Sequence, residues 1–138
     1  MAHHLSKNDV EAAAAMRKLG VLDDLNGHRL DQNDGTILVS CADGDQMHDL
    51  FVHHVEMASG QRSQPRIHLL ALNGGALLIT EEFPLNKELH EDTVLLAHIR
   101  GAVALKGIHT VVLCVHAPCG MAGLAKLSFE ESIDLLMK

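Results

Sequence analysis

Residues 36 to 41 decide the fold. They read Thr36-Ile37-Leu38-Val39-Ser40-Cys41, a largely apolar and β-branched run without strict polar alternation. Strands that are covered on both faces have this continuous pattern, which is typical of parallel sheets. Similar runs follow at 66–72 and 110–115. The sequence therefore predicts an α/β fold with a central, mostly parallel β-sheet.

The segments between these runs favour helices, which would flank the sheet. Apolar residues recur at helical spacing within 46–57, and one long helix over 87–106 is closed by Gly107. Alternating strands and helices imply parallel strands joined by right-handed crossovers. We further expect an N-capped helix at 10–18, loops at 22–34 and 59–64, an irregular stretch at 79–85, and a last helix from a capping-box spacing at 128–131 to Leu136.

The length and composition bound the domain organisation. The chain has 138 residues, which suits one domain with its own core. Phe51, Phe83 and Phe129 are the only aromatic residues, so the core must be mainly aliphatic. We expect a single domain over 1–138, with an N-terminal helix and loop at 1–35 and an α/β core at 36–138.

The charge excludes some classes of partner. The formal net charge is −7 without a basic cluster, which argues against nucleic acid and anionic membranes as partners. No apolar stretch reaches the roughly 18 residues that span a bilayer, and residues 1–7 lack the apolar core of a signal peptide. With only three cysteines, the chain fits a reducing compartment, and we expect a cytoplasmic protein.

Two short motifs carry the chemistry. Cys41-Ala42-Asp43 ends the first apolar run, and His116-Ala117-Pro118-Cys119 follows the third. Thiolates, an imidazole and a carboxylate are ligands that Zn²⁺ prefers. In open α/β sheets, ligands gather at the carboxyl ends of the strands, where both motifs would lie. The pair of motifs therefore predicts a split zinc site.

These motifs resemble those of the β-class carbonic anhydrases. That family carries Cys-x-Asp-x-Arg after its first strand, Arg-Asn-Ala-Gly-Asn after its second, and Gly-His-x-x-Cys-Gly after its third. This chain has, in the same order, Cys41-Ala42-Asp43-Gly44-Asp45, Leu72-Asn73-Gly74-Gly75-Ala76 and Val115-His116-Ala117-Pro118-Cys119-Gly120. The similarity covers about residues 36–124.

The resemblance implies a function and a site. Cys41, His116 and Cys119 would be zinc ligands, and Asp43 would be either the fourth ligand or the neighbour of a zinc-bound water. With an open position, zinc lowers the pKa of water toward ~7, so that hydroxide can attack CO₂ to give bicarbonate. The family forms dimers or higher assemblies, which implies a homodimer or a higher homo-oligomer with the helix at 10–18 packed on the partner.

This chain departs from the family at the residues around the metal. Asp45 stands where the family has the Arg that pairs with its Asp, and Leu72 and Ala76 replace the Arg and the last Asn of the second motif. We consider Arg66 and Arg100 as replacement cations. Three functions fit these residues: a carbonic anhydrase-like lyase, a non-catalytic protein with a closed Cys₂HisAsp zinc, and a hydrolase of another small carbonyl or thiocarbonyl molecule.

The other reactive side chains have simpler interpretations. Cys114 shares a strand face with His116 and could touch the site, although we favour a core thiol. We interpret His48, His53 and His54 as solvated or supporting histidines rather than proton shuttles. Glu81-Glu82 and the acidic run at 88–92 are expected to form a solvated face.

Overall fold

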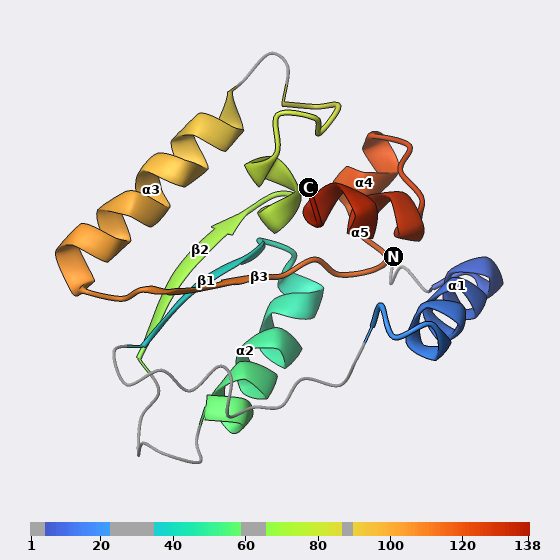
Figure 1. Cartoon of the computed structure of the whole chain (residues 1–138), viewed down its shortest axis with the longest axis horizontal. Helices are drawn as coiled ribbons and strands as arrows, with labels where there is room; N and C mark the ends of the chain where they lie inside the picture. The colour runs from blue at the N-terminus through green and yellow to red at the C-terminus, as the bar shows by residue number, and fades with distance from the viewer. Residues whose placement is uncertain (1–4, 23–34, 59–65, 87–89) are drawn as a thin grey trace.

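The computed structural model describes residues 5–22, 35–58, 66–86 and 90–138. The loops expected at 22–34 and 59–64 lie almost entirely outside these residues. Figure 1 shows the order of the elements along the chain. They are α1 (Lys7–Lys18), β1 (Thr36–Cys41), α2 (Gly44–Ala58), β2 (Ile67–Leu72), the 3₁₀ helix η2 (Gly75–Ile79), α3 (Glu91–Lys106), β3 (Thr110–Leu113), α4 (Gly120–Leu124) and α5 (Phe129–Leu136).

The three strands form an all-parallel sheet in the order β2-β1-β3. Thr36 of β1 is in register with Ile67 of β2 on one side and with Thr110 of β3 on the other. Ile37, Leu38 and Val39 of the central strand are 0% exposed. The apolar run at 36–41 therefore forms the buried strand that its pattern predicts, and the α/β class is confirmed.

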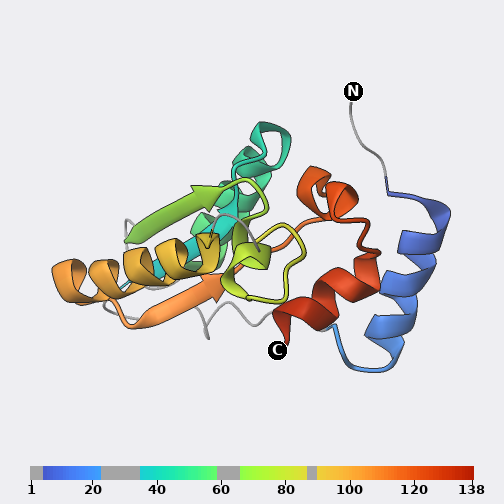
Figure 2. The ribbon, with the colours of Figure 1, turned by 90° about the horizontal axis from the view of Figure 1, so that it is seen from above.

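The helices cover both faces of this sheet. Figure 1 shows α2 on one side of the strands and α3 on the other. This follows from the strand order, because β1 to β2 and β2 to β3 run in opposite directions across the sheet. Right-handed crossovers then place the two connecting helices on opposite faces. In Figure 2, α1 lies at the far end of the molecule from α3, where it packs against α5.

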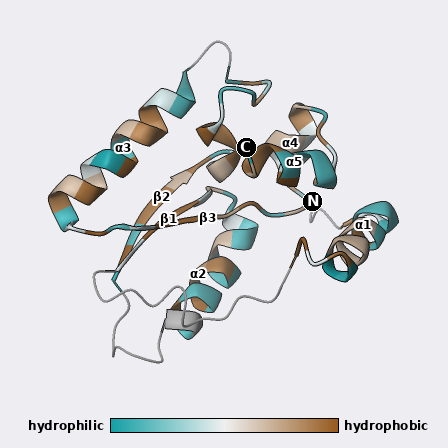
Figure 3. Ribbon diagram, in the orientation of Figure 1, coloured by the Kyte–Doolittle hydropathy of each residue, from teal (hydrophilic) through white to brown (hydrophobic). Residues whose placement is uncertain are grey.

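The core is aliphatic around one aromatic ring. Leu77 and Leu78 of η2 pack with β1 and α3, and Phe83 is the single phenylalanine of the described residues that is fully buried. Asn86 stabilises the end of η2 and the residue after it. Its side-chain amide donates hydrogen bonds to the carbonyls of Leu78 at 2.7 Å and Thr80 at 2.9 Å. Figure 3 shows brown, hydrophobic strands between helices of mixed colour.

Some boundaries and burials differ from the sequence expectations. The first helix starts at Lys7 behind an N-cap at Ser6, and the strand expected at 110–115 ends at Leu113. The solvated acidic face is correct for Glu81 and Glu82 but wrong for Asp92, which is only 8% exposed. Asp92 lies in the first turn of α3, where the unpaired N–H groups of a helix stabilise a carboxylate.

No helix within the described ranges combines the length and the apolar character that crossing a bilayer requires.

Two capping boxes provide a test of which helices hold the fold together. The Ser128 hydroxyl accepts from the Glu131 N–H at 3.1 Å, and Glu131 accepts from the Ser128 N–H at 2.7 Å, which lowers the pKa of Glu131. The box is therefore intact at neutral pH and is lost as the pH falls through that lowered pKa. We expect Ser128→Ala to reduce the free energy of unfolding by about 1 kcal/mol, because α5 buries Ile133 and Leu135.

Ser6 is the matched control because it forms the same box at the start of α1. No residue of α1 is buried, so Ser6→Ala should fray α1 and leave global stability almost unchanged. Denaturant unfolding followed by circular dichroism measures both variants. Equal destabilisation by the two substitutions would contradict this interpretation.

Candidate metal centre

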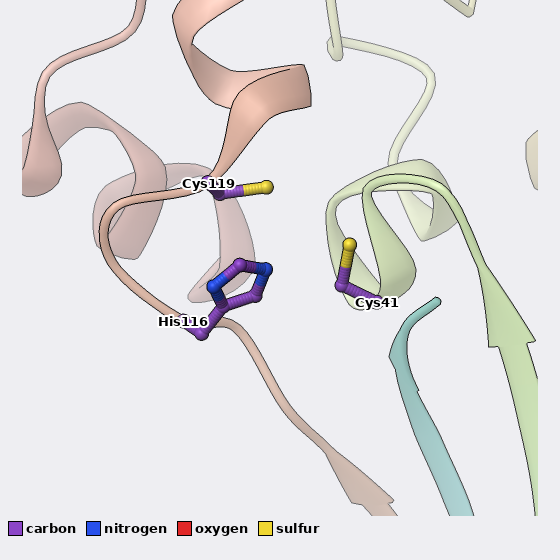
Figure 4. A group of neighbouring side chains, drawn as sticks. All are labelled: Cys41, His116 and Cys119. Carbon is purple, nitrogen blue, oxygen red and sulfur yellow. The ribbon is translucent and has the colours of Figure 1, made fainter. Parts of the chain in front are cut away.

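Three side chains from the two motifs meet at the carboxyl edge of the sheet. The Cys41 and Cys119 sulfurs and a ring nitrogen of His116 all lie within 4.8 Å of one another. Figure 4 shows these side chains turned toward a common space. Within the described part of the chain, this Cys₂His group is the only cluster of its kind, and it can bind a metal ion.

The strand order brings the ligands together. Cys41 is the last residue of β1, and β3 pairs directly beside β1. This pairing extends past the end of β3, because the Cys114 N–H donates to the Val39 carbonyl at 2.8 Å. The chain then leads through His116 to Cys119, the residue just before α4. The expectation that neighbouring strand ends unite the two motifs is confirmed.

His116 provides evidence that the group suits a metal. Both ring nitrogens of His116 are buried, and neither has a hydrogen-bond partner among the described residues. A buried polar atom without a partner costs free energy, about 1–3 kcal/mol. Coordination of an ion through one nitrogen removes part of this cost, and the two cysteines supply ligand atoms beside it. The donor set and its burial therefore fit a metal ion.

Asp43 lies beside the Cys₂His group rather than within it. Its Oδ2 is 3.9 Å from His116 Nε2, and its Oδ1 accepts a hydrogen bond of 3.0 Å from the Asp45 backbone N–H. One carboxylate oxygen is thus held by the start of α2, while the other lies near the site. This position is compatible with either role expected for Asp43.

The third cysteine has a different environment. Burial raises the pKa of the Cys114 thiol to about 11, so it stays protonated at neutral pH. Cys114 is not part of the Cys₂His group, although it lines one cavity of about 270 Å³ on the α2 side of the sheet together with Cys41 and His116. This α2-side cavity is lined by Ser40, Cys41, Gln46, Met47, Asp49, Leu50, His53, Cys114, Val115 and His116.

The histidines of α2 divide into two kinds. His48 and His53 are exposed, as expected, and His53 lines the α2-side cavity. His54 is only 2% exposed, and its Nε2 has no hydrogen-bond partner among the described residues. Burial, followed by the charge of His53, lowers the pKa of His54. The interpretation of His54 as a solvated side chain is therefore wrong.

Cations do not line the cavities described beside the metal centre. The α2-side cavity, a second one that includes Cys41 and Asp43, and a third that includes His116 and Cys119 have no Lys or Arg among their described lining residues. Arg66 precedes β2 and donates to the Lys106 carbonyl at 2.7 Å, at the opposite edge of the sheet. Arg66 of this chain therefore does not replace the Arg missing at position 45.

The resemblance relates the glycine turn after β2 to a motif near the metal, but it implies no contact between this turn and a ligand. The Gly74 backbone N–H donates a hydrogen bond of 3.3 Å to Cys41 Sγ. Paired glycines in the sequence indicate a tight turn or a close backbone approach, but not a hydrogen bond to a cysteine. A backbone donor leaves no further mark in the sequence, so the contact with the sulfur required the structure.

Comparisons with protein-family models, with curated proteins and with solved structures gave no match to this chain.

Proposed function

We propose that Cys41, His116 and Cys119 hold a zinc ion and that the chain is a β-carbonic anhydrase-like protein that hydrates CO₂ to bicarbonate. The convergence within 4.8 Å of two sulfurs and one imidazole that has no hydrogen-bond partner among the described residues carries this proposal. Two thiolates with one imidazole favour zinc over hard cations such as Mg²⁺, which prefer oxygen ligands. The order of the three motifs along the chain supports the β-class resemblance.

The bound ion would supply Lewis-acid chemistry, lowering the pKa of a water molecule toward ~7. Asp43 would orient that water or accept its proton. The Asp45 N–H fixes Asp43 Oδ1, which leaves Oδ2 on the side of His116. A hydrogen bond to one carboxylate oxygen fixes the orientation of the other oxygen. Proton transfer requires such a fixed orientation.

The charges around the site support an uncharged substrate. Asp43 and Asp49 line the cavities that meet at Cys41, and their described linings contain no Lys or Arg to offset these carboxylates. Met47, Leu50 and the neutral Cys114 thiol give the α2-side cavity an apolar wall. CO₂ enters such a cavity without repulsion, whereas an anion is repelled.

A non-catalytic zinc protein is the second candidate. Asp43 Oδ2 lies close to His116 Nε2, and no Arg occupies position 45 to draw this carboxylate away from the ion. A Cys₂HisAsp zinc with four protein ligands is closed and has a structural role. This candidate and the first share the zinc ligands and differ in the fourth position.

Stopped-flow CO₂ hydration on protein of verified zinc content separates the two candidates. If the chain is an enzyme, we expect the wild type to exceed the buffer rate and Asp43→Asn to lose about 100-fold, since a positioned acid or base contributes about 10²–10⁴. Asp45→Arg should raise the rate by pairing with Asp43. Asp45→Asn is the matched control, because it removes the negative charge without adding a cation.

Each outcome assigns the function. A wild-type rate equal to that of buffer, with activity only in Asp45→Arg, would indicate that the site of this chain is closed. It would also indicate that an Arg at position 45, as in the β-class motif, opens the site. If the zinc-loaded wild type and the Asp45→Arg variant are both inactive, the proposed enzymatic activity is contradicted. The structural zinc site then becomes the assigned function. The homodimer and the cytoplasmic location implied above stay predictions.

A further inference from the structure

Two consecutive glycines lie directly against the first metal ligand. Gly74 and Gly75 connect β2 to η2 and have positive φ angles of 95° and 54°. A Cβ atom on Gly75 would lie 2.3 Å from the Cys41 backbone nitrogen and 2.4 Å from the Ser40 carbonyl carbon. These are backbone atoms of the buried central strand, which cannot move aside as a flexible side chain can. Position 75 therefore accepts only glycine while Cys41 keeps its place.

The same turn contacts the side chain of Cys41. The Gly74 N–H donates to Cys41 Sγ at 3.3 Å, and the neighbouring Ala42 N–H donates to the Leu72 carbonyl at 2.9 Å. Two hydrogen bonds, one to the Cys41 side chain and one from the next backbone N–H, thus hold the end of β1 to the segment that ends β2 and begins the turn. Metal ligands are commonly oriented by such outer hydrogen bonds, whose loss costs about 10–100-fold in metal affinity.

We propose that the Gly74-Gly75 turn is the positioning element of the metal centre. Gly75 lets the backbone reach Cys41, and the Gly74 N–H directs one lone pair of the sulfur so that another faces His116 and Cys119. This proposal rests on metal binding at the proposed site but not on catalysis. It assigns to the turn after β2, which supplies no ligand, the task of orienting the ligand of β1.

Cadmium NMR on the 138-residue wild-type chain tests the Gly74 contact. The probe is ¹¹³Cd²⁺ alone, bound to protein that carries ¹⁵N-labelled glycine. A hydrogen bond to a metal-bound sulfur shares electron density along N–H···S–Cd, so we expect scalar coupling between the Gly74 amide proton and ¹¹³Cd. The Gly107 N–H is the internal control, because it donates to the Val103 carbonyl and should show no coupling.

The two possible failures are distinguishable. Bound cadmium with two-sulfur coordination but without coupling at Gly74 would overturn the positioning role and leave the metal centre intact. Failure of the chain to bind cadmium would overturn the metal centre and this proposal together.

A pair of alanine variants tests the role of Gly75. Gly75 and Gly107 have similar φ angles, 54° and 62°, so alanine introduces similar backbone strain at both positions. A Cβ at Gly107 meets nothing within 4 Å, whereas one at Gly75 meets the backbone at Cys41. We expect Gly75→Ala to weaken Co²⁺ binding by at least about 10-fold and to change the sulfur-to-cobalt absorption band.

The Gly107→Ala variant should keep wild-type cobalt affinity and spectrum. Folded Gly75→Ala protein with the same affinity and absorption band as Gly107→Ala would overturn the role of Gly75. The cadmium measurement uses the wild-type chain and decides the role of Gly74 independently of how well the Gly75→Ala chain folds.

Discussion

Replacing Cys119 with alanine is expected to lower zinc affinity by at least about 100-fold. Loss of a hydrogen bond to a ligand already costs about 10–100-fold, and loss of the ligand itself should cost more. Cys119 contributes one of three ligand atoms that lie within 4.8 Å of one another. Its removal leaves one sulfur and one imidazole, which form an incomplete site for a tetrahedral ion. Competition with a chromophoric chelator, together with the zinc content of purified protein, measures the loss.

Cys114→Ala is the matched control for this experiment. Cys114 is also a partly buried cysteine without a disulfide, five residues earlier in the chain, and it lies outside the Cys₂His group. We expect this variant to keep one zinc per chain at wild-type affinity. Equal zinc loss from both variants would contradict the assigned ligands, as would full zinc retention by Cys119→Ala.

Removing the metal is expected to produce the largest change in stability. The ligands come from the end of β1 and from the segment after β3, so only the folded chain brings them together. A ligand that binds only the folded state adds about 4 kcal/mol when its free concentration is about 1,000 times its Kd. For a chain of this size, this corresponds to a melting temperature about 14 °C higher.

Differential scanning calorimetry of the zinc-loaded chain and the chelated chain measures this shift. The Cys119→Ala variant should show a much smaller difference in melting temperature with and without zinc, because its zinc affinity is at least about 100-fold weaker. A wild-type melting temperature that does not change on chelation would show that the ion is not coupled to folding at this site.

The fold was predictable where the pattern of residues is long or chemically distinctive. The apolar run at 36–41 indicates a buried strand because it is short and rich in β-branched residues, and cysteine and histidine at two strand ends indicate a ligand set. The parallel sheet then follows from the alternation of strands and helices. The meeting of Cys41 with His116 was therefore predictable without coordinates.

Short elements and individual burials were less predictable. The helix α4 has five residues with two glycines, and η2 has five residues, so neither is long enough to show a helical period. Their formation depends on packing against the core rather than on local preference. The burial of Asp92 and His54 likewise depends on which helix face meets the sheet. The polarity of a residue does not show which face that is, so both side chains were wrongly expected to be solvated.

The central position of β1 has a consequence for how the protein is made. Both strands that pair with β1 come later in the chain, and Cys119 comes later still. During synthesis, Cys41 leaves the ribosome long before the residues that complete its coordination shell. Parallel pairing of distant segments must be completed before the ligands converge, and such pairing is slow. An ion bound at the proposed site would therefore be acquired late in biosynthesis, and it would stabilise a sheet that has already assembled.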